Sequence, residues 1–195
     1  LYSLVKEYCT YRRYDLVTAA SLSDYDYKGP NDPAFVCVEG SRMQKDDVRR
    51  LSLLLSMDIN VILLDLPSPS FIKENEELAN LLGIIAVKSE SVETDGIRLT
   101  DNFLLGGGVF YQVDEDDDEK IKKRQDLELN MPWYVVGSGS TMYMCGIMSM
   151  PEGADDDYQY GYLPAICWRH PVGDAAVYAV NGDYMQNETG LGFLA

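Results

Sequence analysis

The sequence is poor in basic residues and has a single histidine. Among its 195 residues, 16 are Lys or Arg against 32 Asp or Glu, which gives a formal net charge of −16. A chain this acidic has no cation excess to displace the counterions of a nucleic acid or to bind an anionic membrane surface. No apolar run reaches the ~18–20 residues that a spanning helix needs. We therefore expect no nucleic-acid partner and no direct membrane contact from this segment.

The sequence also lacks the motifs of common cofactor and metal sites. It contains no phosphate loop, no Rossmann glycine fingerprint and no G-x-S-x-G. Its 4 cysteines never form C-x-x-C, which argues against zinc-ribbon and thioredoxin readings. Cys37, Cys145 and Cys167 lie in apolar stretches typical of buried thiols. We expect no cofactor and no metal.

Two patterns leave a metal alternative open. The acidic run 114–119 could bind Ca²⁺ through carboxylates, but it lacks the spacing and turn glycine of an EF-hand, which favours a solvated loop. Met142, Met144, Met148 and Met150 alternate along one expected strand. Such a stripe could hold a soft metal, although a flexible core face explains it more simply.

The composition is that of one folded domain. Hydrophobic residues make up 46% of the chain and aromatic residues 11%, enough for a substantial core. We expect residues 1–195 to form a single α/β domain. The chain begins at Leu1 without Met and stops in an apolar stretch, 190–195. Because termini are usually polar, we expect a piece excised from a longer chain.

A strand–helix–strand unit is the clearest structural signal. The apolar runs 34–38 and 61–64 predict two strands buried on both faces, and Val48, Leu51 and Leu55 give the amphipathic period of a helix between them. A capping box at 41–44 is expected to start that helix. The two strands must then be parallel. A further helix over 73–82, closed by Gly83, and a strand over 84–87 should follow.

The second half predicts a different architecture. Short strand candidates occur at 133–136, 142–149, 163–169 and 176–180, with turns at 95–96 and 106–108. Upstream, 1–13 reads as a helix and 14–18 as a strand. The expected fold is therefore α/β: a flavodoxin-like parallel sheet with helices on both faces and a β-rich second half.

Two segments resemble the class I glutamine-amidotransferase-like domains. They are Phe35 to Gly40, continuing through the helix to 63–67, and Ala176-Val177-Tyr178-Ala179-Val180-Asn181-Gly182-Asp183. The resemblance is narrower to an uncharacterised bacterial family that pairs such a domain with a polysaccharide-deacetylase-like domain. It implies an extracytoplasmic, membrane-anchored envelope protein in exopolysaccharide handling, its anchor lying in a segment absent here.

The catalytic residues of that family have no match in this sequence. The family's His-Pro-Glu reads His170-Pro171-Val172 here, and residues 65–69 contain neither the Cys nor the Gly of the nucleophile elbow. The active site is therefore expected to be degenerate. The alternative is a hydrolase or amidotransferase variant with Cys37 and His170 as its catalytic pair, which requires their side chains to meet.

The leading hypothesis is a non-catalytic accessory domain that binds a glycan or a neighbouring domain of its own chain. Ligands of parallel sheets bind beyond the carboxyl ends of the strands. The candidates there are Glu39, Ser41, Asp65 and Ser68. A structural spacer without any ligand is the third reading.

Overall fold

A computed structural model describes residues 6, 19, 21–24, 35–94, 96–99, 124–125, 129–147 and 163–181. Its elements, in chain order, are η1 (Leu22–Asp24), β1 (Phe35–Glu39), η2 (Gly40–Arg42), α2 (Lys45–Ser56), β2 (Asn60–Leu64), α3 (Pro69–Glu74), α4 (Glu76–Leu82), β3 (Ile84–Thr94), β4 (Gly96–Leu99), β5 (Arg124–Gln125), β6 (Leu129–Val136), β7 (Thr141–Ile147), β8 (Ala165–Val172) and β9 (Ala175–Val180). Apart from Lys6, the helix and strand expected over 1–18 lie outside the described residues, as do the turn at 106–108 and the acidic run 114–119.

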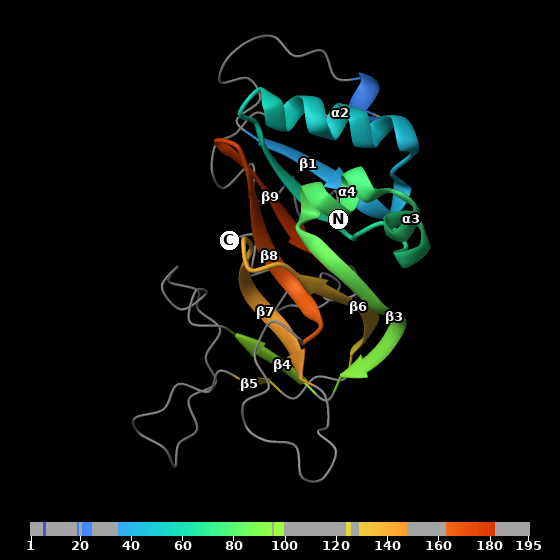
Figure 1. Cartoon of the computed structure of the whole chain (residues 1–195), viewed down its shortest axis with the longest axis vertical. Helices are drawn as coiled ribbons and strands as arrows, with labels where there is room; N and C mark the ends of the chain where they lie inside the picture. Colours follow the sequence, from blue (N-terminus) through green and yellow to red (C-terminus); the bar gives the residue numbers. More distant parts are fainter. Residues whose placement is uncertain are drawn as a thin grey trace.

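Two sheets organise these elements (Figure 1). The main sheet has seven strands in the order β1-β2-β9-β8-β7-β4-β5, and β3 pairs with β6 in a separate two-stranded ribbon. Strands β1, β2 and β9 are parallel, whereas β8, β7, β4 and β5 add antiparallel pairs. This confirms the α/β class, the parallel βαβ unit and the β-rich second half, and it makes the main sheet mixed rather than wholly parallel.

Helix α2 begins later than the sequence analysis predicts. Residues 40–42 form the 3₁₀ turn η2, so Ser41 does not cap the helix. Gln44 is the N-cap instead, and its backbone N–H donates to the Asp47 carboxylate at 2.8 Å in a reciprocal capping box. Asp46 and Asp47 also place negative charge in the first turn, where the helix dipole stabilises it.

The helix predicted over 73–82 is two short helices. Ser68 caps α3, its Oγ accepting from the Phe71 N–H at 3.3 Å, and Pro69 occupies the first turn. Asn75 separates α3 from α4, because its side-chain amide donates to the Phe71 carbonyl at 2.6 Å. Gly83 ends α4 with a φ of 69°, as predicted for a left-handed C-terminal cap.

Strand β3 leaves the main sheet. The strands on either side of the turn expected at 95–96 have different partners, because β3 pairs with β6 while β4 pairs with β5 and β7. Of the predicted methionine stripe, Met148 and Met150 lie outside the described residues, and the first two methionines do not form a regular stripe. Met142 pairs with Trp168 and Met144 with Cys167, with a register shift between them. Since residues 167 and 168 lie on opposite sheet faces, these two methionines do not share a face.

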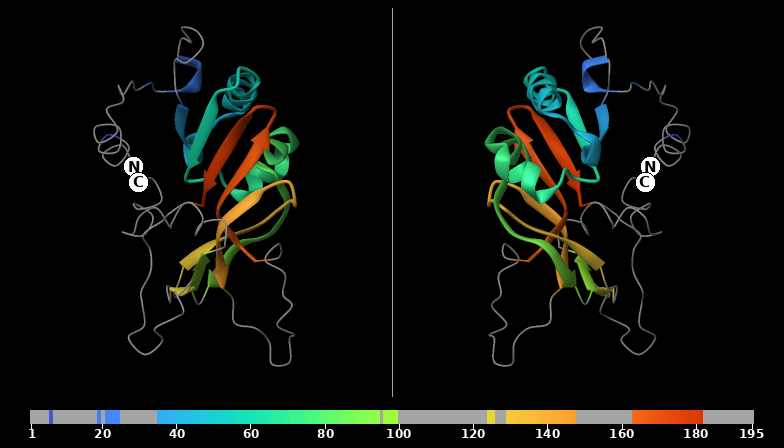
Figure 2. Two further views of the ribbon diagram at one scale, coloured as in Figure 1. Left: turned by 90° about the vertical axis from the view of Figure 1, so that its left-hand side faces the viewer. Right: turned by 90° about the vertical axis from the view of Figure 1, so that its right-hand side faces the viewer.

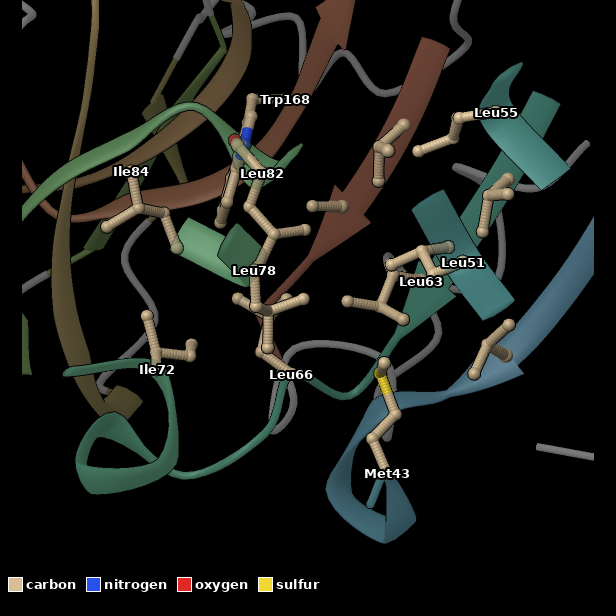
Figure 3. Close-up of a cluster of buried hydrophobic side chains, with 14 of the residues drawn as sticks. Met43, Leu51, Leu55, Leu63, Leu66, Ile72, Leu78, Leu82, Ile84 and Trp168 are labelled. Atoms are coloured by element: carbon tan, nitrogen blue, oxygen red, sulfur yellow. The ribbon is translucent and has the colours of Figure 1, made fainter. Parts of the chain in front are cut away.

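Helices α2 and α4 pack on one face of the main sheet (Figure 2). Their leucines meet inward-facing residues of β2 and β8, as the close-up shows (Figure 3). Trp168 is fully buried there, and its indole N–H donates to the Leu82 carbonyl at 2.8 Å, which fixes α4 against β8. The opposite face carries the buried side chains of Leu64, Cys167 and Val180. The opposite face is therefore buried at this level of the sheet, whereas Ile62, Tyr178 and Arg169 on the same face are half-buried.

Candidate functional site

The carboxyl ends of β1 and β2 form one edge, which we call the rim and define as residues 39–41 and 65–68. Glu39 pairs in register with Leu64, so the segments that follow both strands begin side by side. A Cβ on Gly40 would lie 2.5 Å from the Asp65 carbonyl oxygen. The two backbones thus touch at a point where only glycine fits. The structure brings the four predicted binding residues to this rim.

Asp65 has the most unusual backbone at the rim. Its φ is 59°, and among the described non-glycine residues only Asp58 shares a positive value, at 62°. Left-handed conformations are unfavourable for most L-residues and are tolerated best by Asn and Asp. Asp65 occupies a turn between a strand and a helix, which is where a nucleophile elbow places its reactive side chain. Here that turn presents a carboxylate, a hydrogen-bond acceptor rather than a thiol.

Tyr134 contacts the rim from the β3–β6 ribbon. This fully buried tyrosine of β6 donates its hydroxyl hydrogen to the Pro67 carbonyl at 3.2 Å. Burial and the nearby Asp65 carboxylate raise the pKa of Tyr134 far above its usual value, so the phenol keeps its proton. The ribbon therefore fixes the chain just after Asp65. The sequence analysis missed this residue, because only a strand pattern marked 133–136 and nothing in it indicated a contact 67 residues away.

The other rim residues have local roles. The Glu39 carboxylate forms an ion pair with the Arg42 guanidinium at 3.2 Å, and its side chain is 38% exposed. The Ser68 hydroxyl caps α3 and lies 3.1 Å from the Ser70 hydroxyl. Ser41 is exposed on η2. Ser41 and Asp65 are thus the rim side chains best placed to meet a ligand.

Cys37 and His170 are not brought together. Strands β2 and β9 separate β1 from β8, so the two backbones are about 14 Å apart at ~4.8 Å per strand. In addition, Cys37 is in register with Arg169 through Ile62 and Tyr178, which places His170 on the opposite sheet face. The geometry does not support the alternative catalytic pair. Of the other cysteines, Cys145 and Cys167 are buried, and burial raises the pKa of the Cys167 thiol.

His170 contacts a serine instead. Its Nδ1 lies 3.0 Å from the Ser140 hydroxyl, next to Gly83. Burial lowers the pKa of His170 below its ordinary value of 6.5. His170 is level with Val177, whereas the rim begins beyond Val180, three residues further along β9. The histidine is therefore about 10 Å from the rim along the strand direction.

Neither a metal cluster nor a membrane span is found in the described ranges. No group of three or more His, Cys, Asp or Glu side chains there could hold a metal ion. None of the described helices is long and apolar enough to cross a membrane.

Comparison with known proteins identifies the fold. No protein-family model matches the chain, and no curated protein matches it significantly. Among solved structures, a ThuA-like protein from Bacteroides uniformis ATCC 8492 aligns with a TM-score of 0.53 at 11% identity, over 98% of this chain and 78% of that one. The structural neighbours thus include a ThuA-like protein, which has a class I glutamine-amidotransferase-like fold, and this chain shares the α/β fold of that neighbour. A cytoplasmic protein of Salmonella typhimurium LT2, STM1381, aligns with a TM-score of 0.56 at 9% identity, over 98% and 80%.

A third solved structure is much longer than this chain. The exo-β-1,4-mannosidase Op5Man5 from an Opitutaceae bacterium, strain TAV5, aligns with a TM-score of 0.53 at 13% identity over 96% of this chain. This chain covers only 27% of the mannosidase. The same fold thus occurs as one part of a larger carbohydrate-active protein.

Proposed function

We propose that this domain binds a glycan at the rim and has no catalytic function there. The observation that carries the proposal is the position of Asp65. Its carboxylate stands on a left-handed backbone at the turn between β2 and α3, and Tyr134 holds the loop that follows it. Strain at a residue held by its surroundings is common at ligand-binding sites. A carboxylate and neighbouring hydroxyls suit the hydroxyl groups of a sugar, which donate and accept hydrogen bonds.

The fold's occurrence within a mannosidase supports a carbohydrate ligand. We place the domain in a bacterial, extracytoplasmic envelope protein that handles exopolysaccharide, with a polysaccharide-deacetylase-like partner domain and a degenerate amidotransferase site. The resemblance in 35–40, 63–67 and 176–183 supports this context. A neighbouring domain of the same chain is the alternative partner, and a structural spacer is the alternative role.

Two matched variants test the proposal. Asp65→Gly removes the carboxylate but keeps the left-handed backbone that glycine prefers. Asp58→Gly makes the same change at the same φ, before β2 instead of after it. Calorimetry with β-1,4-mannooligosaccharides, followed by envelope-type oligosaccharides, should show binding that Asp65→Gly abolishes and Asp58→Gly leaves unchanged.

Thermal unfolding gives a second measurement of the same binding. A ligand at about 100 times its Kd adds about 2.7 kcal/mol to the free energy of unfolding, and for a chain of this length the Tm should rise by about 5–10 °C. Binding that survives Asp65→Gly would place the glycan elsewhere. If no oligosaccharide binds, the spacer reading replaces the proposal.

A further inference from the structure

The Ser140–His170 pair lies about 10 Å from the rim along the strand direction and has no role in the proposed function. It joins three segments: the turn 137–140 between β6 and β7, strand β8, and the end of α4. The Ser140 N–H donates to the Gly137 carbonyl, and the Gly137 N–H donates to the Gly83 carbonyl, each at 2.9 Å. These bonds hold the serine in place beside the imidazole.

Gly83 provides the room for this pair. A Cβ at position 83 would overlap both His170 Nδ1 and Ser140 Oγ. The backbone of Gly83 therefore packs directly against the contact between the serine hydroxyl and the ring nitrogen. Gly83 also ends α4 in a left-handed conformation. Glycine is therefore required here both by the backbone conformation and by the lack of room for a Cβ.

A substrate could approach from the turn. Ser138 and Gly139 are exposed, and a side chain at 139 would meet nothing within 4 Å. Ile85 is 71% exposed, and its Cγ2 would lie 3.1 Å from a Cβ on Gly137. An exposed isoleucine beside Gly137, the first residue of the turn that carries Ser140, offers an apolar contact for a short acyl chain.

We propose that Ser140 and His170 form a nucleophile–base pair that hydrolyses small carboxylic esters. A hydroxyl within hydrogen-bond distance of an imidazole is the basic requirement for serine nucleophilic catalysis. The reaction requires the His170 tautomer that carries its proton on Nε2, so that Nδ1 accepts from the hydroxyl.

The proposed steps conserve atoms and protons. Ser140 Oγ bonds to the ester carbonyl carbon while its proton passes to His170 Nδ1. The C–O bond to the alcohol then breaks, and the alcohol oxygen takes that proton. Water attacks the acyl-serine, gives one proton to Nδ1 and releases the carboxylic acid, after which the proton returns to Ser140. The net reaction is ester plus water to acid plus alcohol.

A fluorophosphonate probe tests the nucleophile directly. Ser140 Oγ should form a bond to phosphorus as fluoride leaves, and peptide mass mapping should place the adduct on Ser140. Ser140→Ala should abolish the adduct. His170→Gln should slow its formation by about 10²–10⁴-fold, the usual contribution of a general base. Ser138→Ala changes a serine of the same turn and should label at the wild-type rate.

The pH profile and a second substrate complete the test. Labelling and the hydrolysis of p-nitrophenyl acetate should rise with pH as His170 loses its proton, and should level off below pH 7 because burial lowers its pKa. Asp58→Gly changes a residue with no assigned role in either site and should label normally. The proposal is overturned if folded wild-type protein gives no adduct at Ser140, or if folded His170→Gln labels at the wild-type rate.

Discussion

The parallel part of the main sheet and the β3–β6 ribbon differ in how regularly their strands pair. Strands β1, β2 and β9 pair without any shift in register, whereas β3 and β6 shift register three times over their length. Strands β2 and β9 are buried over most of their length, and a shift of one residue would expose one set of apolar side chains and bury another. Burial on two sides therefore fixes the register of these strands.

The ribbon is not constrained in this way. Strand β3 mixes exposed residues with buried and half-buried ones, and the exposed residues are Ile85, Lys88, Glu90, Ser91 and Glu93. An exposed side tolerates bulges, which bend the strand. From this ribbon, Tyr134 of β6 reaches the loop after β2. The strands that pair in regular register, β1 and β2, end at the rim. The ribbon, whose register shifts, contacts the rim through the hydrogen bond from Tyr134 to Pro67.

Substitution of the two tryptophans of the chain should give the largest difference in stability between the main sheet and the ribbon. Trp168 is fully buried in the main sheet, whereas Trp133 is half-buried in the ribbon. We expect Trp168→Ala to lower the free energy of unfolding by about 3–5 kcal/mol, the usual cost of removing a buried aromatic side chain. It also removes the hydrogen bond to Leu82.

The matched variant is Trp133→Ala, and urea unfolding of both proteins measures the difference. We expect a loss of about 1–2 kcal/mol for Trp133→Ala, because less apolar surface returns to water. Equal losses would mean that the ribbon is as important to stability as the main sheet. The main sheet would then not be the more stabilising of the two regions.

The same contrast explains how much the sequence could predict. The apolar runs 34–38 and 61–64 and the helical period between them depend on local burial, and the structure confirms the parallel unit they predict. Gly83 was predicted as a helix end for an equally local reason. Contacts between distant segments leave no such pattern. The approach of Gly40 to Asp65, the support from Tyr134 and the pairing of Ser140 with His170 all depend on tertiary structure.

Rim membership followed from a topological rule, whereas side-chain roles did not. Parallel strands end at the same edge, so Glu39 and Asp65 could be placed together from sequence. The Cys37–His170 hypothesis relied on residue types alone. It did not include the register, which places these side chains on opposite faces.

Two glycines at the junction between the regions give a smaller expected effect. Gly83 ends α4 and begins the ribbon, with a positive φ and no room for a Cβ. Gly83→Ala should lower the free energy of unfolding by at least about 1–2 kcal/mol, the cost of a left-handed L-residue, and the clash with His170 should add to it. Chemical denaturation measures this loss.

Gly139 is the control for that substitution. A Cβ there meets nothing within 4 Å, so Gly139→Ala should change the free energy of unfolding by less than about 0.5 kcal/mol. If Gly83→Ala is equally mild, α4 and the turn 137–140 can move apart at little cost. The junction would then be a loose connection rather than a fixed one.

The smallest expected effect concerns pH at the same junction. Because burial lowers the pKa of His170 below 6.5, the unfolded chain takes up a proton at a higher pH than the folded protein does. The contribution of His170 to stability is therefore complete above about pH 6.5 and declines as the pH falls through the folded-state pKa. Carboxylates titrate mainly at lower pH. Urea unfolding at pH 7.5 and 5.5 should show a decrease for the wild type and a smaller one for His170→Gln. Equal decreases would mean that the imidazole titrates alike in both states, and that the contact among Ser140, His170 and Gly83 opens too readily to join the two regions.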